Sequence, residues 1–337
     1  MRILIPQPLP HLPGIAGSLG REHEIISASG TSEAELAEAV ATADALVATA
    51  MDVSRKVLLA GQRLLVAGTP QVGFDRIDVA AATDEGIPVI SSAGVSPGSV
   101  AEFTLGLMIS LARRIARSDR DLRRTGWSTR RNYAEPDAQL GIELTGRCLG
   151  IVGVGHIGAS LAAKCQAAFG CRVLAYDPFV SAEQMASLGI EKRESLVDLA
   201  GEADFLTLHV PLTSQTHHLV DAKVLAVMKP TAFVINVARG GVLDEAALVS
   251  ALRNGSLAGA ALDVYESEPL PAGHPLLELD EVILTPHIAG VTHESNELRS
   301  AAFVARLTDV LAGRKPAGLA NPAVWAAYEE RRRRLGH

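Results

Sequence analysis

Three polar residues of complementary chemistry follow apolar runs in the last third of the sequence: Arg239, Glu268 and His287. Taken singly, they could be a surface cation, part of an acidic loop, and a helix-capping or core histidine. Together, a guanidinium can bind a carboxylate, an imidazole can move a proton near neutral pH, and a carboxylate can orient that imidazole. Beside a nicotinamide, this set suits hydride transfer at a hydroxyl-bearing carbon next to a carboxylate.

A glycine pattern supplies a place for such a nicotinamide cofactor. The apolar run that begins at Cys148 ends in Gly-x-Gly-x-x-Gly, formed by Gly153, Gly155 and Gly158. In a strand, turn and helix N-terminus of this kind, the first glycine permits the turn, the second lets the backbone approach a diphosphate, and the third lets the helix pack closely. Asp177 ends the next apolar run, 19 residues after Gly158, where a carboxylate binds a ribose diol and repels a 2′-phosphate. The pattern predicts dinucleotide binding, with NAD favoured over NADP.

The sequence predicts parallel β-sheets whose strands would position these polar residues and glycines. Short apolar runs alternate with amphipathic stretches, which is typical of βαβ units, and ligands bind such sheets beyond the carboxyl ends of the strands. The predicted strands are 2–6, 45–48, 64–67 and 88–90, then two near 149 and 173, and finally 205–208, 233–237, 260–263 and 282–285. The last six match the number expected for a doubly wound dinucleotide-binding domain.

The clearest helical patterns flank the glycine-containing part. Residues 99–125 are predicted to form one long helix, apolar in its first half and arginine-rich from 113 to 124. The arginines indicate a solvated helix face, with anion binding as the alternative. Thr292 is predicted to cap a last long helix that ends near Leu311, and the tail 329–337 is predicted to be frayed and solvated.

Composition restricts the class of protein. A chain of 337 residues favours two domains, and 48% hydrophobic with 20% charged residues fits an α/β protein. The formal net charge of −7 argues against general nucleic-acid binding. The longest apolar stretch, 103–112, is too short to span a bilayer, and the first residues do not form a leader. We therefore expect a cytoplasmic protein without nucleic-acid or membrane partners.

Cysteines and histidines give no evidence of a metal site in the sequence. The three cysteines lie on predicted core elements without the paired spacing of a zinc site, so they are expected to be reduced packing residues, with a regulatory thiol as the alternative. They are Cys148, Cys165 and Cys171. His209 ends a predicted strand, and His217 with His218 falls in a polar turn. Because no Cys or carboxylate cluster completes a ligand set, no metal is expected.

The motifs described above are also found together in a known family. The sequence resembles the D-isomer-specific 2-hydroxyacid dehydrogenases, which include phosphoglycerate dehydrogenases and the glyoxylate or hydroxypyruvate reductases. Six blocks in the family's order carry the resemblance: Val72–Asp78, Ser99–Glu102, Gly153–Gly158, Asn236–Gly241, Ala261–Val264 with Glu268-Pro269, and Thr285–Gly290. The resemblance implies an α/β fold with a Rossmann doubly wound parallel sheet plus a smaller flavodoxin-like α/β substrate domain. Residues 1–100 and 292–337 would form the substrate domain, and 101–291 the NAD-binding domain.

The resemblance also implies residue roles. Arg239 would bind the substrate carboxylate and polarise the carbonyl, His287 would exchange the proton, and Glu268 would hold and tune the imidazole. Substrate binding would involve Thr49, Val72, Gly73, Ser96 and Arg239. The cofactor would be bound by Gly153, Gly155, His156, Ile157, Gly158, Asp177, Val210, Pro211, Thr216, Val237, Ala238, Arg239, Asp263, His287, Ala289 and Gly290.

The expected function is NAD-dependent oxidation of a D-2-hydroxy acid, or the reverse reduction of a 2-keto acid, in a homodimer. One alternative is a D-3-phosphoglycerate dehydrogenase without a regulatory domain; another is a non-enzymatic NAD(H)-sensing protein like the corepressors related to this family. Phosphoglycerate enzymes tend to carry a basic residue after the strand in 46–51 and an asparagine at the position of Ser96. Neither is present here, and no regulatory domain follows the last helix, which lowers the expectation of 3-phosphoglycerate.

Overall fold

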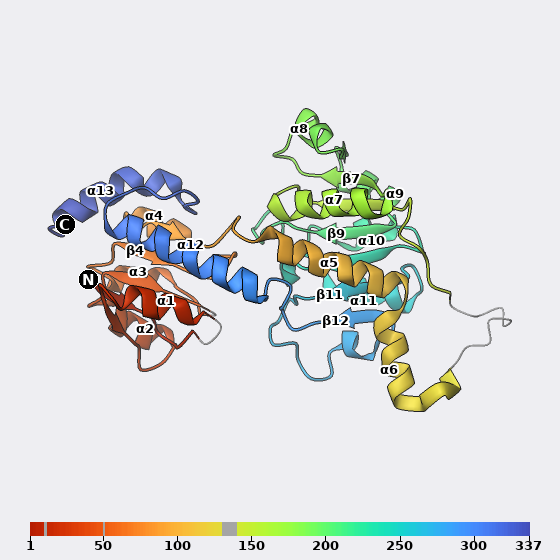
Figure 1. The fold of residues 1–337 in the computed structure, drawn as a ribbon, viewed down its shortest axis with the longest axis horizontal. Helices are drawn as coiled ribbons and strands as arrows, with labels where there is room; N and C mark the ends of the chain where they lie inside the picture. The colour runs from red at the N-terminus through yellow and green to blue at the C-terminus, as the bar shows by residue number, and fades with distance from the viewer. Residues whose placement is uncertain (10–11, 50, 130–139) are drawn as a thin grey trace. The chain divides into compact units, whose positions relative to one another are not determined.

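The computed structural model describes residues 1–9, 12–49, 51–129 and 140–337. The chain forms two compact units, one from residues 1–96 with 291–337 and the other from residues 97–290. Each unit contains its own parallel sheet (Figure 1). Among the described residues, no helix has the length and apolar character that crossing a membrane requires.

The first unit has a five-stranded sheet with the order β2-β1-β3-β4-β5, which is the flavodoxin-like order. Its strands are β1 Arg2–Leu4, β2 Glu24–Ile26, β3 Ala45–Val47, β4 Val66–Gly68 and β5 Val89–Ile90. The sequence did not predict β2. This strand lies at the sheet edge and is partly exposed, so its apolar run is too short to stand out.

Helices cover both faces of this sheet, because successive side chains of a strand point to opposite faces. Leu4 and Leu46 pack with α2 (Glu33–Val40), α3 (Arg55–Ala60) and α4 (Val79–Asp84). Ile3 and Val47 pack with α1 (Pro13–Leu19), α12 (His293–Leu311) and α13 (Trp325–Arg334). The two C-terminal helices therefore complete the core of the N-terminal part of the chain.

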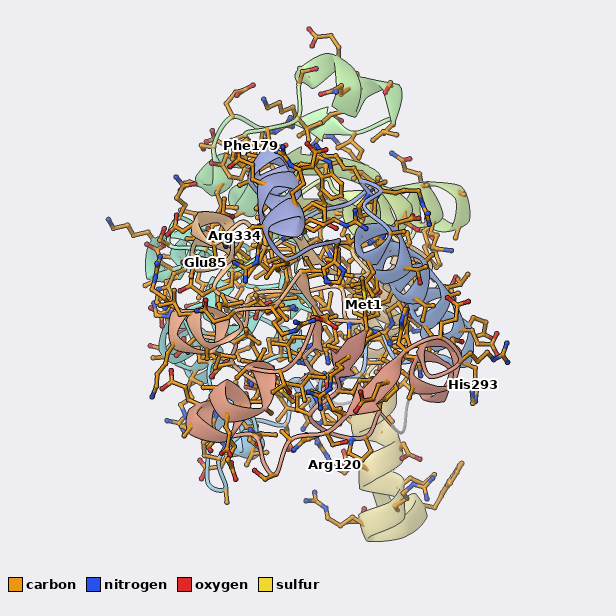
Figure 2. The ribbon with its side chains drawn as sticks, turned by 90° about the vertical axis from the view of Figure 1, so that its left-hand side faces the viewer. Met1, Glu85, Arg120, Phe179, His293 and Arg334 are labelled. Atoms are coloured by element: carbon orange, nitrogen blue, oxygen red, sulfur yellow. The ribbon has the colours of Figure 1, made fainter. Side chains whose placement is uncertain are left out.

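The C-terminal segment corrects one prediction and confirms another. Thr292 caps α12 by accepting a hydrogen bond from the Ser295 N–H, and the helix ends at Leu311, as predicted. The tail is exposed over most of its length, as predicted, but residues 329–334 are helical instead of frayed. They belong to α13, on which Arg334 is labelled in Figure 2, and Arg331 of this helix is buried. The sequence did not show that Arg331 is buried, because a run of arginines does not indicate which of them has buried hydrogen-bond acceptors.

The second unit has a seven-stranded sheet with the order β12-β11-β10-β9-β6-β7-β8, a doubly wound Rossmann arrangement as predicted. Its strands are β6 Cys148–Val152, β7 Arg172–Tyr176, β8 Glu191–Lys192, β9 Phe205–Leu208, β10 Phe233–Asn236, β11 Gly259–Leu262 and β12 Val282–Leu284. The predicted number of six was wrong. The extra strand, β8, is an edge strand of two charged residues, so the sequence has no apolar run that would predict it.

Helices also cover both faces of the larger sheet. The helices of this unit are α5 Pro97–Ala112, α6 Ile115–Thr125, α7 His156–Phe169, α8 Ala182–Ser187, α9 Leu196–Glu202, α10 Ala222–Ala226 and α11 Glu245–Arg253. Leu149 and Ile151 of β6 pack with α5 and α7, whereas Cys148 and Val152 pack with α9, α10 and α11. The three cysteines are free and buried.

The predicted helix 99–125 is broken into α5 and α6. Arg114 adopts a left-handed conformation with φ of 58°. The Ala112 carbonyl, which a continuous helix would pair with the Ala116 N–H, instead accepts a hydrogen bond from the Ile142 N–H at 2.8 Å. The Ala116 N–H is bonded to the Ser110 hydroxyl at 3.3 Å. A segment distant in the sequence therefore ends α5, which helical periodicity alone does not show.

Candidate active site

The three polar residues follow three neighbouring strands of the larger sheet. Arg239 comes after β10, Glu268 after β11 and His287 after β12. These strands pair in parallel, with Asn236 beside Leu262 and Leu262 beside Leu284. Their carboxyl ends therefore share one edge of the sheet, which is where ligands bind in open α/β sheets.

His287 and Glu268 form a hydrogen-bonded pair. The distance from His287 Nδ1 to Glu268 Oε2 is 2.8 Å, and the two side chains are 48% and 32% exposed. Because a carboxylate accepts, Nδ1 donates in this bond. Nε2 is then the ring nitrogen that can exchange a proton with a bound molecule, which is the arrangement that general acid–base chemistry requires.

The backbone that carries His287 is held by Asp263. The buried Asp263 carboxylate accepts hydrogen bonds from the Thr285 hydroxyl at 2.6 Å, the Ile288 N–H at 2.9 Å and the Ala289 N–H at 2.8 Å. His287 has φ of 55°, a left-handed conformation that is rare outside glycine and occurs often at functional sites. Asp263, predicted from the sequence as a cofactor residue, thus fixes the loop that carries His287.

Tyr265 is a supporting residue that the sequence did not single out. Its N–H donates to Glu268 Oε1 at 3.1 Å, and its hydroxyl shares one proton between the carbonyl oxygens of Leu262 and Thr285, which lie at 3.1 and 2.9 Å. Burial raises the pKa of Tyr265 to about 12, so the hydroxyl stays protonated. The only sequence signal is an aromatic residue between the strand end and Glu268.

The turn after β10 presents Arg239. Buried Asn236 shapes this turn, since its side chain donates to the Arg239 carbonyl at 2.9 Å and accepts from the Ala238 N–H at 3.1 Å. The guanidinium of Arg239 is partly buried and donates to the Ala238 carbonyl at 2.7 Å. A partly desolvated, planar cation at a strand end is suited to binding a carboxylate.

The glycine turn has the backbone shape that its pattern predicts. Gly153 has φ of 95°, and a Cβ atom there would lie 2.8 Å from the His209 carbonyl oxygen. A Cβ atom on Gly158 would lie 2.3 Å from the Gly153 carbonyl oxygen, whereas one on Gly155 would meet open space. Gly155 is the N-cap of α7 and provides no side-chain cap. The first N–H groups of α7 are thus suited to bind an anion.

Asp177 lies directly after β7 and beside this turn. Its carboxylate accepts hydrogen bonds from the Val154 N–H and the Phe179 N–H, each at 2.9 Å. Phe179, labelled in Figure 2, is 88% exposed. A carboxylate fixed in this position can bind a ribose diol.

The remaining predicted residues of this unit also lie at the carboxyl edge of its sheet. His156 and Ile157 begin α7, and the others follow β9, β10 or β12. The latter are Val210, Pro211, Thr216, Val237, Ala238, Ala289 and Gly290. The hydroxyl of Thr216 donates to the Pro211 carbonyl at 2.6 Å, which closes the turn after β9.

The predicted substrate residues of the first unit lie at the carboxyl edge of the smaller sheet. Thr49 follows β3, Val72 and Gly73 follow β4, and Ser96 follows β5. The Ser92 N–H donates to the Gln71 carbonyl at 2.8 Å, which joins the segments after β4 and β5. Four residues chosen from separate motifs therefore share one edge of one sheet.

Three histidines follow β9, namely His209, His217 and His218. Burial lowers the pKa of His209 to about 3, so this side chain is neutral, and its Nε2 lies 3.0 Å from the Thr207 hydroxyl. The expectation that no carboxylates accompany His218 was wrong, because Asp244 and Glu266 both lie beside it. The fold brings these two acids to His218 from later segments, so the local sequence could not show them.

Comparison with known proteins shows which family this sequence is similar to. Residues 105–289 match the model of the D-isomer specific 2-hydroxyacid dehydrogenase, NAD binding domain. The chain is 40% identical over 291 residues to D-3-phosphoglycerate dehydrogenase from Methanocaldococcus jannaschii, covering 86% of this chain and 54% of that protein. It is 40% identical over 294 residues to glyoxylate reductase from Thermofilum pendens, covering 87% and 86%.

A solved structure shows the same fold. D-lactate dehydrogenase from Aquifex aeolicus, complexed with NAD and lactic acid, superposes with a TM-score of 0.81 at 29% identity, covering 93% of this chain and 96% of that one. The chain spans about half the length of the phosphoglycerate dehydrogenases that it matches. It belongs to the family of D-isomer specific 2-hydroxyacid dehydrogenases.

Proposed function

We propose that the protein is an NAD-dependent dehydrogenase that interconverts D-2-hydroxy acids and 2-keto acids. The observation that carries this proposal is the pair of His287 and Glu268, 2.8 Å apart at the sheet edge that also presents Arg239. The glycine turn for a dinucleotide belongs to the same unit.

The glycine turn and Asp177 would hold the cofactor, which as NADH would supply the hydride that C2 of a keto acid accepts in reduction. His287 donates the Nε2 proton to the substrate oxygen, so the carbonyl becomes a hydroxyl group. Glu268 accepts the Nδ1 hydrogen bond and so orients the ring for this transfer. Arg239 binds the substrate carboxylate and polarises the carbonyl. In oxidation, His287 takes the proton back.

The proposed cofactor preference is NAD over NADP. It is supported by Asp177, whose carboxylate is fixed by two backbone N–H groups beside the glycine turn. A 2′-phosphate would face this negative charge, while a ribose diol would donate hydrogen bonds to it.

The proposed substrate is a small 2-keto acid without a phosphate group. Thr49, Val72, Gly73 and Ser96 would recognise it from the carboxyl edge of the smaller sheet, with Val72 and Gly73 using their backbone N–H groups. Thr49 and Ser96 are neutral, so neither supplies the cation that a phosphate ester would need. We also propose that the enzyme is cytoplasmic and that it is a homodimer, which the family resemblance implies; light scattering during gel filtration would test the dimer.

A substrate panel tests the proposed function. Purified protein is mixed with NADH and glyoxylate, hydroxypyruvate, pyruvate or longer 2-keto acids, and the loss of NADH absorbance is followed. We expect turnover with at least one small keto acid and a much lower rate with NADPH. NADH binding without turnover on any of them would contradict the proposal and favour a nucleotide-sensing protein.

A further inference from the structure

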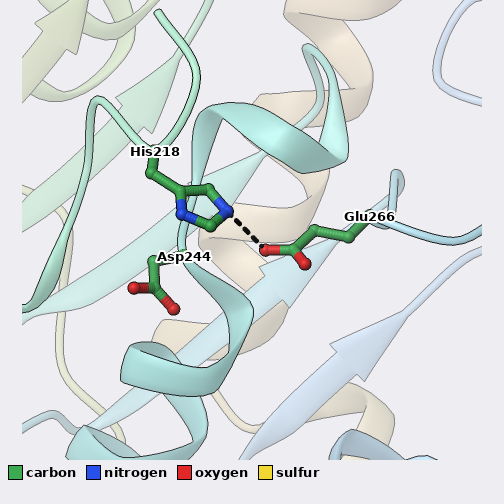
Figure 3. A group of neighbouring side chains, drawn as sticks. All are labelled: His218, Asp244 and Glu266. Carbon is green, nitrogen blue, oxygen red and sulfur yellow. Dashed lines mark hydrogen bonds and ion pairs between the residues drawn. The ribbon is translucent and has the colours of Figure 1, made fainter.

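A second group of chemically reactive side chains lies in the larger unit, apart from the pair of His287 and Glu268. It contains His218, Asp244 and Glu266, whose potential ligand atoms all lie within 4.8 Å of one another. Figure 3 shows the His218 ring between the two carboxylates, with its Nε2 directed at Glu266. The distance from Nε2 to Glu266 Oε1 is 2.9 Å.

The three side chains come from separate segments. His218 lies in the turn between β9 and α10, Asp244 is the N-cap of α11, and Glu266 lies in the loop after β11. No ion pair with a lysine or arginine satisfies the two carboxylates in this group, as far as the described ion pairs show. Two carboxylates beside one imidazole form a concentration of negative charge and lone pairs, which favours a cation.

Neighbouring residues hold the three side chains in place. The Glu266 N–H donates to the buried Glu245 carboxylate at 2.6 Å, and the Glu245 N–H donates back to Glu266 Oε1 at 3.2 Å. The second carboxylate oxygen of Glu245 lies 3.4 Å from His274 Nε2. Such outer hydrogen bonds orient ligands in metal sites.

Asp244 and His218 are similarly restrained. Asp244 Oδ1 caps α11 by accepting from the Ala247 N–H at 2.9 Å, which leaves its other oxygen for a ligand. The His218 N–H donates to the Gly241 carbonyl at 2.8 Å, and its ring stacks on His217 with centroids 4.0 Å apart. The side chains are therefore already ordered, so binding of an ion costs little conformational entropy.

We propose that His218, Asp244 and Glu266 bind a divalent transition-metal ion, with Zn²⁺ as the first choice. One imidazole nitrogen and two carboxylate oxygens suit Zn²⁺, and water would complete the coordination. Mg²⁺ and Ca²⁺ prefer sets made of oxygen alone. Binding requires a neutral imidazole with a free lone pair, so a proton leaves the nitrogen that binds the ion, and affinity falls as the solution is acidified.

The site would connect segments that matter for the proposed chemistry. Asp244 follows the turn that carries Arg239, and Glu266 precedes Glu268 by two residues. A bound ion would therefore tie these two loops to the turn of His218. Because the ion binds the folded chain, it should raise the melting temperature of the protein.

Titration calorimetry with ZnCl₂ on the untagged full chain, without nucleotide or substrate, tests the proposal. We expect one Zn²⁺ per chain in the strongest class of site. His218→Asn, Asp244→Asn and Glu266→Gln should each weaken binding by about 100-fold, and Glu245→Gln by about 10-fold. These changes keep most local hydrogen bonds, so circular dichroism should show folded variants.

Two control variants separate this site from other histidines. His217→Asn alters the stacked neighbour, and His287→Gln removes the histidine that is paired with Glu268. Both should keep the affinity and the rise in melting temperature. The proposal is overturned if Zn²⁺ fails to bind, or if binding survives in the His218, Asp244 and Glu266 variants or disappears in His287→Gln.

Discussion

Two carboxylates define the position of His287 at the residue scale. Glu268 holds the ring through Nδ1. The Asp263 carboxylate accepts hydrogen bonds from the Thr285 hydroxyl before the residue and from the Ile288 and Ala289 N–H groups after it. A ring held in this way can present Nε2 in one orientation. Positioning of this kind contributes strongly to acid–base catalysis.

Replacing the imidazole should separate chemistry from cofactor binding. We expect His287→Gln to lower the turnover number about 10³-fold, because the route for the proton is lost, while the NADH dissociation constant stays within about twofold. Steady-state rates and quenching of protein fluorescence by NADH measure the two quantities. Turnover within tenfold of the wild-type value would rule out the assigned role.

Asp177 should determine the choice between cofactors. In Asp177→Ala, the ribose diol loses its charged acceptor and a 2′-phosphate loses its repulsion. We expect the ratio of kcat/KM for NADH to that for NADPH to fall roughly 10- to 100-fold. Phe179→Ala, which alters the exposed neighbour, serves as a control for general damage to this loop. An unchanged ratio in Asp177→Ala would mean that another group sets the preference.

The sequence could predict residues whose task follows from their type and their place after a strand. Arg239, Glu268 and His287 were found in this way, although their catalytic roles remain predictions. It could not show the group of His218, Asp244 and Glu266. Those residues meet through the pairing of distant segments, and each has an ordinary local role in a turn, a helix cap or a loop.

At the scale of elements, close packing of two loops fixes the proposed site. The turn after β10 passes directly against the loop after β11. A Cβ atom added to Gly240 would lie 1.8 Å from the Tyr265 carbonyl carbon, which is backbone and cannot move aside alone. The loop of Glu268 therefore depends on a glycine next to Arg239.

Gly240→Ala should displace the loop after β11. We expect the free energy of unfolding to fall by more than about 3 kcal/mol and turnover to fall with it. Gly241→Ala is the matched control, since its Cβ atom would meet the flexible Leu212 side chain at 3.3 Å. That variant should lose less than about 1.5 kcal/mol. Denaturant titration measures both; equal losses would contradict this explanation.

Periodicity predicted the long central strands and missed the features that depend on distant partners. β2 and β8 are short edge strands that each pair with one neighbour; β2 has only three residues, and β8 has two charged ones. The break between α5 and α6 arises because the Ile142 N–H donates a hydrogen bond to the Ala112 carbonyl, which a continuous helix would pair with the Ala116 N–H. Local sequence carries little information about either effect.

At the scale of the whole molecule, the C-terminal helix is part of the first unit. Arg331 donates to the carbonyl oxygens of Leu64, Gly61 and Glu85 at 2.7, 2.8 and 3.0 Å. Burial lowers the pKa of Arg331, yet a guanidinium remains charged at neutral pH. The last residues of the chain thus bond directly to its first hundred.

Arg331→Ala should destabilise the first unit. Several buried carbonyl groups would lose a charged donor, so we expect the free energy of unfolding to fall by about 3 kcal/mol. Arg333→Ala, on the exposed side of the same helix, should change it by less than about 0.5 kcal/mol. Calorimetry can follow the two units if they melt separately. Equal effects of both changes would mean that α13 is not anchored by Arg331.

The most direct test of the proposed function is stereochemical. The D and L enantiomers of small 2-hydroxy acids, such as lactate and glycerate, are each incubated with NAD and the purified protein, and NADH formation is measured. We expect NADH from at least one D enantiomer, at a rate at least about 100-fold above its L partner, and almost none from His287→Gln. Equal rates with both enantiomers, or NADH formation that persists in His287→Gln, would contradict the proposed function.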